Sequence, residues 1–402
     1  MPPLNLAVLY SYLKKQDINL NVLDLNIECF HKSIEDIKKT WICPDKGLEL
    51  NSYIKEKFND YLKQELDNVY VGEETYYCFS VFNANKEISL YLAEYLKKKY
   101  KSAKIIFGGP EVLYEYNKGN EFPFSDYADI SIVGEGERPL IEIIQGSKEK
   151  VFVYSQDKKH ETLIDFDCFP LNKYLRQGFL PVLMSKGCIN KCAFCVECIL
   201  RKGFVSRINC IITEIENYIN KYGVKNFIFH DSLINGDLKA LELFCDKVLE
   251  KKLNIHWEGQ VYIRSDMSYD LMLKMKQAGC YNIFIGAESF SEKVLEYFNK
   301  GYKQADVLDF LKKLKQAGLH SELSLIVGAE AEGEKEFFET LDFIKQNKEY
   351  ISKLAQVNEL KQLPGTDLKV VEADISKKRV DMLVGVFEAE GIKYTKEFIN
   401  NL

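Results

Sequence analysis

The sequence predicts an α/β protein in which an N-terminal doubly wound, flavodoxin-like parallel sheet precedes a partial (β/α)6 barrel. Short apolar runs alternate with amphipathic segments over almost the whole chain, and several of these runs end in glycine-containing turns. Strand–helix alternation is typical of parallel sheets, because each parallel connection needs a crossover. The length of 402 residues is also more than one ordinary domain requires, which agrees with two successive sheets.

The composition argues against several classes of protein. The net charge is −6, from 54 basic and 60 acidic residues, so we do not expect a nucleic-acid partner. No apolar run reaches the ~18 residues of a transmembrane helix. Residues 1–16 also lack the basic start and small-residue cleavage site of a signal peptide. We therefore expect a soluble, cytoplasmic protein without a transmembrane segment.

The first 150 residues supply the elements of the doubly wound sheet. Apolar spacing predicts a helix over residues 4–15, alternation predicts a strand over residues 18–25, and the lysine- and glutamate-rich stretch 31–66 predicts an inserted helical segment. Further strands are predicted at residues 76–82, 104–110 and 129–137. The last two runs end in turns where a backbone without side chains could approach a ligand closely. These turns contain Gly108, Gly109, Gly134 and Gly136.

The doubly wound sheet lacks one expected strand. Such a sheet begins with a strand that is central in the flavodoxin-like order, yet this chain begins at the turn before its first helix. We expect the natural chain to begin some ten to fifteen residues upstream, which is roughly one strand plus its turn.

A second series of strands and helices begins at residue 180. Residues 151–179 have little helical pattern and predict a linker with a hairpin around 151–154. Six strands are then expected, at residues 180–185, 225–231, 255–263, 280–289, 321–328 and 354–363. The predicted divisions are a sheet domain over 1–150, a linker over 151–179, a barrel over 180–366 and a short helical tail over 367–402. A barrel of this kind places its chemistry at the carboxyl ends of its strands.

Three of the eleven cysteines carry the strongest chemical signal. Cys188, Cys192 and Cys195 have CxxxCxxC spacing directly after the first barrel strand, so three thiolates lie on one tight loop. Thiolates select iron–sulfur clusters or zinc. Structural zinc needs four ligands, usually as two separated pairs, and Cys198 is the available fourth. Four cysteines within eleven residues are cramped, which favours an iron–sulfur cluster.

With this spacing, and with Phe194 directly before the last cysteine, the segment resembles the radical S-adenosylmethionine (SAM) superfamily. The resemblance implies a [4Fe–4S] cluster on the three cysteines, whose open iron chelates SAM. It also implies reductive cleavage of SAM to methionine and a 5′-deoxyadenosyl radical.

The segments PPLNLA, FGGPE and IVGEGE ahead of the triplet are similar to the cobalamin-binding radical SAM subfamily. That similarity implies cobalamin at the turns that contain Gly108, Gly109, Gly134 and Gly136. Because no DxHxxG motif occurs, it implies cobalamin held without a histidine on its lower face.

Residues at the ends of other barrel strands are candidates for the SAM site that the resemblance implies. Glu288 and Ser289 end the fourth strand and would reach the ribose or amino group of SAM, unless they are surface residues. Arg264 ends the third strand and suits the SAM carboxylate, with a helix cap or surface salt bridge as the alternative. Asp231 ends the second strand and lines the SAM or substrate site, or caps the next helix. Gly328 follows the fifth strand and would contact adenine, unless it belongs to a plain loop.

The resemblance therefore implies a cobalamin-dependent radical SAM enzyme and favours a methyltransferase that acts on an unactivated carbon. Its reducing partner would be a flavodoxin or ferredoxin. Two alternatives stay open: a radical SAM enzyme without cobalamin that catalyses another rearrangement or cyclisation, and an iron–sulfur electron-transfer or redox-sensing protein. The barrel and its polar strand ends favour an enzyme over an electron carrier. The sequence pattern does not distinguish a small-molecule, peptide or lipid substrate, and it assigns no side chain a catalytic role.

Overall fold

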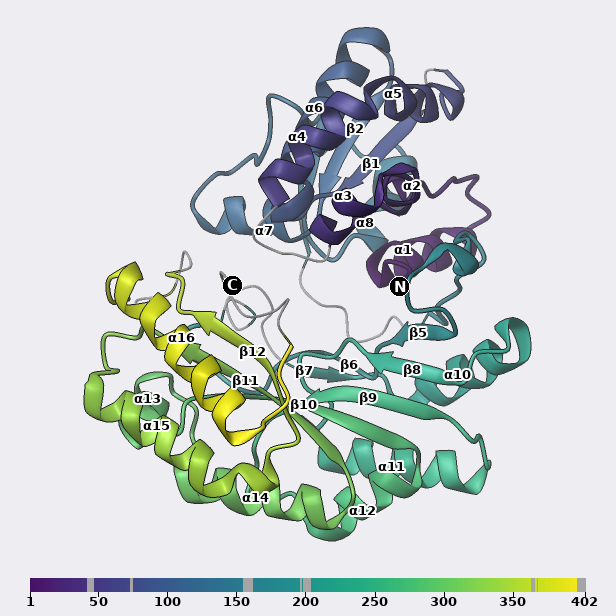
Figure 1. Ribbon diagram of the computed structural model, residues 1–402. Coiled ribbons are helices and arrows are strands. Elements are labelled where there is room, and N and C mark those ends of the chain that lie inside the picture. Colours follow the sequence, from purple (N-terminus) through teal and green to yellow (C-terminus); the bar gives the residue numbers. More distant parts are fainter. Residues whose placement is uncertain are drawn as a thin grey trace. The chain divides into compact units, whose positions relative to one another are not determined.

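The computed structural model describes residues 1–41, 47–72, 75–154, 162–195, 197, 204–362, 366 and 368–395. The chain divides into two compact units, residues 1–177 and 178–402, which are considered separately (Figure 1). None of the helices in these described ranges is long and apolar enough to cross a membrane.

The first unit contains a four-stranded parallel sheet with the order β1-β2-β3-β4. The strands are β1 (Tyr76–Ser80), β2 (Lys104–Gly108), β3 (Ile130–Gly134) and β4 (Val151–Tyr154). The helices between them are α6 (Lys86–Lys99), α7 (Pro110–Asn117) and α8 (Glu137–Ile144). Ahead of the sheet lie α1 (Leu4–Lys14), α2 (Leu25–Lys32), α3 (Glu35–Trp41), α4 (Gly47–Lys57) and α5 (Asn59–Asn68).

Helices cover both faces of this sheet, as a doubly wound fold requires. Successive residues of a strand point to opposite faces. Ile105 and Phe107 accordingly belong to an apolar cluster with residues of α5 and α6, among them Leu92. Ile106 belongs to a second cluster that contains Leu13 of α1 and other residues of α8 and β4.

Two expectations for this unit were wrong. Residues 18–24 form no strand, and α2 begins at Leu25 because the Asp24 carboxylate caps it by accepting a hydrogen bond from the Ile27 amide at 3.2 Å. Residues 151–154 form no hairpin. They are strand β4, which pairs in parallel with β3 and buries Phe152 in the second apolar cluster.

The second unit is a six-stranded parallel sheet with the order β5-β8-β9-β10-β11-β12. Its strands are β5 (Phe179–Val182), β8 (Asn226–Phe229), β9 (His256–Val261), β10 (Cys280–Glu288), β11 (His320–Val327) and β12 (Lys353–Glu359). Its helices are α10 (Ile208–Tyr222), α11 (Leu238–Glu250), α12 (Tyr269–Gln277), α13 (Glu292–Tyr297), α14 (Gln304–Gln316), α15 (Glu334–Asn347) and α16 (Ala373–Glu390). All six strands match those predicted, and the partial-barrel fold class is confirmed.

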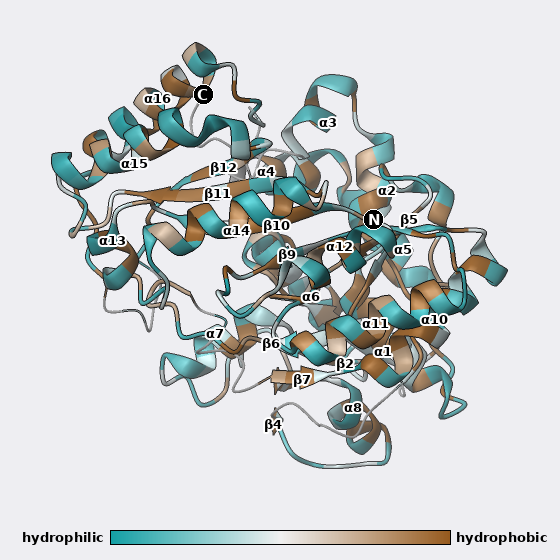
Figure 2. Ribbon diagram, turned by 90° about the horizontal axis from the view of Figure 1, so that it is seen from below, coloured by the Kyte–Doolittle hydropathy of each residue, from teal (hydrophilic) through white to brown (hydrophobic). Residues whose placement is uncertain are grey.

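The core of this unit lies between the sheet and the helices along its outer side (Figure 1). In Figure 2 the strands β11 and β12 are mostly apolar, whereas helices such as α11 and α15 carry one apolar and one polar side. Trp257 of β9 is fully buried, and its indole donates a hydrogen bond to the Ala278 carbonyl at 2.9 Å. The apolar layer therefore fixes the strands whose carboxyl ends precede Asp231, Arg264 and Ser289.

Candidate metal centre

The three predicted cysteines lie on one loop, residues 188–197, which we call the cysteine loop. The loop directly follows a short strand, β6 (Ser185–Gly187), which pairs antiparallel with β7 (Phe204–Ser206). Gly187 has a φ of 81°, a left-handed conformation that suits glycine at this turn. Cys192 is buried, Cys188 and Cys195 are partly exposed, and the Cys195 amide donates to the Cys192 carbonyl at 3.0 Å.

Burial and nearby charges shift the pKa values of Cys188 and Cys192. Burial raises the pKa of Cys192 to about 11, and the other two thiols also raise it. Burial likewise raises the pKa of Cys188, and Lys300 opposes the shift at both residues. In the described ranges no three histidine, cysteine or acidic side chains already surround a single point. Three thiols on one loop are nevertheless a suitable donor set for a soft metal centre, because metal binding removes their protons. Cys198, the alternative fourth ligand, lies outside the described residues.

The end of β8 holds both arms of the cysteine loop. The Asp231 carboxylate accepts hydrogen bonds from the Met184 amide at 3.1 Å and from the Ser185 hydroxyl at 2.5 Å, on the arm that enters the loop. Ser232 donates to a carboxylate oxygen of Glu197 at 2.9 Å, on the arm that leaves it. Burial raises the pKa of Asp231 to about 7. These contacts give Asp231 a role in shaping the loop.

The turn after α13 holds the middle of the cysteine loop from another side. The Phe298 carbonyl accepts from the Ala193 amide at 2.9 Å, and the Asn299 side chain donates to the Lys191 carbonyl at 2.7 Å. The rings of Phe194 and Phe298 meet edge to face, with centroids 5.1 Å apart. Phe194 therefore packs the loop against this turn.

A buried ion pair, which the sequence analysis missed, lies beside the loop. Lys300 directly follows the α13 turn, and its ammonium lies 2.8 Å from the Gly286 carbonyl and 3.5 Å from a Glu288 carboxylate oxygen. The side chains of Lys300 and Glu288 are only 4% and 9% exposed. Burial raises the pKa of Glu288, while Lys300 lowers it. Three aromatic rings, those of Phe194, Tyr262 and Tyr302, lie 5.4–5.6 Å from the ammonium.

Glu288 occupies an unusual backbone position at the end of β10. Its φ is 65°, and the pairing of β10 with β11 shifts register between Gly286 and Glu288. The bulge turns this carboxylate toward Lys300. The neighbouring Ser289 is fully buried, and its hydroxyl lies 3.1 Å from that of Thr340 in α15. The structure thus separates two side chains that the sequence analysis had grouped.

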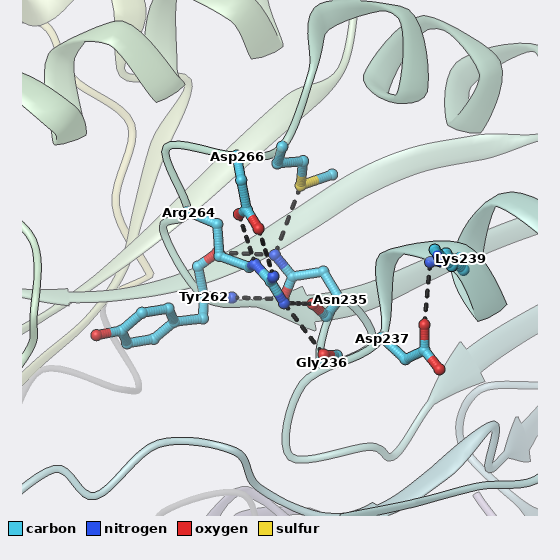
Figure 3. A network of polar contacts seen from close by, with 8 residues as sticks. Asn235, Gly236, Asp237, Lys239, Tyr262, Arg264 and Asp266 are labelled. Carbon is cyan, nitrogen blue, oxygen red and sulfur yellow. Dashed lines mark hydrogen bonds and ion pairs between the residues drawn. The ribbon is translucent and has the colours of Figure 1, made fainter.

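Neighbouring residues form hydrogen bonds with the guanidinium of Arg264 (Figure 3). Its guanidinium donates to the Asp266 carboxylate at 2.8 and 2.7 Å and to the carbonyls of Asn235 and Gly236 at 2.8 and 3.1 Å. The Tyr262 ring extends away from this network. These bonds match the salt-bridge alternative for Arg264 and occupy four of its five N–H donors, which leaves too few for a bidentate bond to a SAM carboxylate.

Gly328, the predicted adenine contact, lies where α16 approaches β11. Its φ is 91°, and an added Cβ would collide with the Ser376 hydroxyl. The Gly328 amide donates to Glu332 at 2.8 Å, and Glu332 in turn accepts from Arg379 of α16 at 2.8 Å. Close packing of α16 therefore accounts for a glycine at this position.

The four glycines predicted to contact cobalamin lie at the carboxyl ends of β2 and β3. Gly109 and Gly134 have φ values of 102° and 97°. A Cβ on Gly109 would lie 2.8 Å from the Val81 carbonyl, and one on Gly134 would collide with the Tyr154 carbonyl. Gly108 ends β2, and Gly136 caps α8. Local backbone geometry alone thus requires glycine at two of the four positions.

Sequence comparison relates the second unit to a known family. Residues 182–344 match the profile of the radical SAM superfamily. An uncharacterized methyltransferase of Pyrococcus horikoshii is 27% identical over 45% of this chain and 40% of its own length. Bacteriochlorophyllide d C-12(1)-methyltransferase of Chlorobaculum tepidum is 26% identical over 55% of this chain and 50% of its own length. The chain thus spans about half the length of these two relatives.

Other relatives carry out different chemistry. The ribosomal protein uS12 methylthiotransferase RimO of Caldanaerobacter subterraneus is 25% identical over 82% of this chain and 74% of its own length. Reaction type therefore varies among proteins at this level of identity.

Solved structures share the fold of nearly the whole chain. The methyltransferase TsrM of Kitasatospora setae, with tryptophan and a SAM analogue bound, aligns with a TM-score of 0.67 at 14% identity and covers 91% of this chain and 72% of its own. The cobalamin-dependent radical SAM enzyme OxsB, with aqua-cobalamin bound, aligns with a TM-score of 0.61 at 16% identity and covers 86% of this chain and 52% of its own. The predicted resemblance is thereby confirmed at the level of the fold.

Proposed function

We propose that this protein binds a [4Fe–4S] cluster through Cys188, Cys192 and Cys195 and cleaves SAM reductively, because residues 182–344 match the radical SAM superfamily. When bound, such a cluster supplies the electron that cleaves SAM to methionine and a 5′-deoxyadenosyl radical. The observation that carries this proposal is the arrangement of three thiols on one loop, which residues after β8 and the α13 turn hold through hydrogen bonds. An external one-electron donor, such as a flavodoxin or ferredoxin, would provide the reducing equivalent.

We assign different roles to the residues around this loop. Asp231 and Phe194 keep the loop in shape through their hydrogen bonds and ring packing. Glu288 is a buried carboxylate beside the loop that, unlike Asp231, makes no hydrogen bond to the strand entering the loop, so we assign to it the contact with the SAM amino or ribose group. Arg264 and Gly328, whose local contacts are already made, stay weaker candidates for SAM contacts.

For the first unit we propose cobalamin binding at the carboxyl ends of β2 and β3. The support is the shared fold with TsrM and OxsB and the presence of Gly108, Gly109, Gly134 and Gly136 at these ends. On the same basis, and on the names of two relatives, we propose transfer of a methyl group to an unactivated carbon. The match to a methylthiotransferase makes sulfur insertion with methylation the second candidate reaction.

The first experiment tests the cysteine loop. The full chain is purified and reconstituted with iron and sulfide under anaerobic conditions, and iron content and absorption at about 400 nm are measured. We expect a four-iron complement that disappears when Cys188, Cys192 and Cys195 are all replaced by alanine. Cys245→Ala, which changes a fully buried cysteine of α11, is the matched control and should keep its iron. A full four-iron complement in the triple variant would place the cluster elsewhere.

Product analysis separates the candidate functions. Incubation of the reconstituted protein with SAM and dithionite should release 5′-deoxyadenosine; its absence supports an electron-transfer or redox-sensing protein instead. Titration with hydroxocobalamin, followed by absorption, should show saturable binding. Without such binding, a radical SAM enzyme that uses no cobalamin becomes the better description.

SAM affinity distinguishes the two charged candidates. Glu288→Gln removes one charge-assisted contact, which is worth roughly 1.5–3 kcal/mol, so SAM should bind about tenfold or more weakly. Arg264→Met should leave SAM affinity unchanged, because its donors are taken up by Asp266 and two carbonyls. The reverse pattern would restore the sequence-based role of Arg264.

A further inference from the structure

We infer that the Lys300 ammonium compensates the negative charge of the thiolates on the cysteine loop and thereby sets the reduction potential of a cluster bound there. Lys300 acts in this inference as a positioning residue, through its charge, and needs no contact with substrate. The inference rests on the proposed function, because it requires a cluster on Cys188, Cys192 and Cys195.

Lys300 is fixed relative to the loop by the backbone that carries it. The two preceding residues, Phe298 and Asn299, are the ones that bond Ala193 and Lys191 of the loop. The Lys300 side chain is 4% exposed, and its ammonium donates to the Gly286 carbonyl at 2.8 Å. Its charge is therefore held at a constant position beside the cysteine loop instead of moving through solvent.

The surroundings stabilise this charge and only partly offset it. The rings of Phe194, Tyr262 and Tyr302 favour a desolvated cation, yet they carry no net charge. The Glu288 carboxylate, 3.5 Å from the ammonium, offsets part of its charge, so the two side chains act on the loop with opposite signs. Burial of both groups weakens solvent screening, so the field of Lys300 extends to its neighbours.

The ammonium also lies close to the cysteine loop itself. It is 5.5 Å from the ring centroid of Phe194, the residue directly before Cys195. A positive charge held at this range favours the state of a bound cluster that carries one more electron.

Two substitutions should shift the reduction potential of the cluster in opposite directions. Reduction by an external donor adds one electron to the cluster. Loss of the Lys300 charge should therefore make reduction harder, and loss of the Glu288 charge should make it easier. A purely structural role for the pair would give shifts of the same sign or none, because both variants would disturb the same packing.

The test is a redox titration of reconstituted full-length protein, without SAM, followed by electron paramagnetic resonance. Lys300→Met should shift the one-electron reduction equilibrium roughly tenfold, which is about 59 mV, toward more negative potential. Glu288→Gln should shift it to more positive potential, and Lys300→Arg should stay near the wild type. Lys274→Met, which removes a lysine paired with Glu242 and Asp246 of α11, is the matched control and should have no effect.

Each possible result of the redox titration either supports or overturns the inference. Equal potentials for wild type and Lys300→Met, at equal iron content, overturn the inference. If Lys300→Met holds no iron, Glu288→Gln decides the sign, and an unchanged or more negative potential in that variant overturns the inference. If the wild type itself binds no cluster, the proposed function fails, which is a different result from an unshifted potential.

Discussion

Replacement of Asp231 by asparagine should change how the stability of the second unit depends on pH. Asp231 is buried at the end of β8, and its pKa is raised by burial to about 7 from an ordinary value of 3.8. The folded protein therefore holds a proton that the unfolded chain releases between these two values. The stability that this proton contributes is complete below about pH 4 and is lost as pH rises from there through 7.

The magnitude follows from the size of the shift. One pKa unit corresponds to about 1.4 kcal/mol, so this group alone should destabilise the fold by about 2.5 kcal/mol between pH 5 and pH 7.5. An asparagine side chain has no proton to release in this range, so in the variant this part of the slope should vanish. Asp231→Asn should accordingly become more stable, relative to the wild type, as pH rises.

The assay is urea unfolding at pH 5, 6, 7 and 7.5, followed by tryptophan fluorescence. The chain has two tryptophans, and a Trp41→Phe background leaves Trp257 of β9 as the reporter of the second unit. Asp309→Asn, which changes an exposed aspartate of α14, is the control and should leave the slope unchanged. Parallel stability curves for wild type and Asp231→Asn would refute the reasoning, because they would mean that Asp231 ionises freely in the fold.

Two further predictions concern the packing of α16 on β11. Gly328→Ala should lower the free energy of unfolding by roughly 1–3 kcal/mol, because the φ of 91° disfavours a side chain and the added Cβ would collide with Ser376. Gly385→Ala changes an open helical position and should instead raise the free energy of unfolding by about 0.5–1 kcal/mol. Equal effects of the two substitutions in urea unfolding would contradict this account. Arg379→Met should cost about 3–5 kcal/mol, because it leaves the buried Glu332 carboxylate without its cation, and a cost below about 1 kcal/mol would show that water reaches this carboxylate.

The fold was largely predictable because strand and helix periods dominate the sequence. The runs at 280–289 and 321–328 became β10 and β11 with nearly the predicted limits. The strand expected at 18–25 failed for a local reason. Apolar and polar residues do alternate in this segment, but Asp24 is also an N-cap residue. Because no neighbouring strand supplies hydrogen-bond partners for its backbone, the segment leads into helix α2 instead of forming a strand.

The candidate site was predictable only where its residues are close in sequence. The spacing of the three cysteines lies within eight positions, so it can be recognised without a fold. Lys300 follows an ordinary helix end in YFNKGY, and nothing in that segment indicates burial, because lysine is usually exposed. Two of the carbonyls that accept hydrogen bonds from Arg264 lie 28 and 29 positions earlier in the chain. These carbonyls come close to Arg264 only because β8 and β9 pair.

The anchoring of the cysteine loop by the α13 turn has a consequence for biosynthesis. The bond between Asn299 and Lys191 joins residues 108 positions apart. While the ribosome is still making the intervening helices, the thiols therefore sit on a peptide that lacks this support. The proposed metal site therefore reaches its final shape only after the ribosome has made α13 and Asn299, long after the three cysteines themselves.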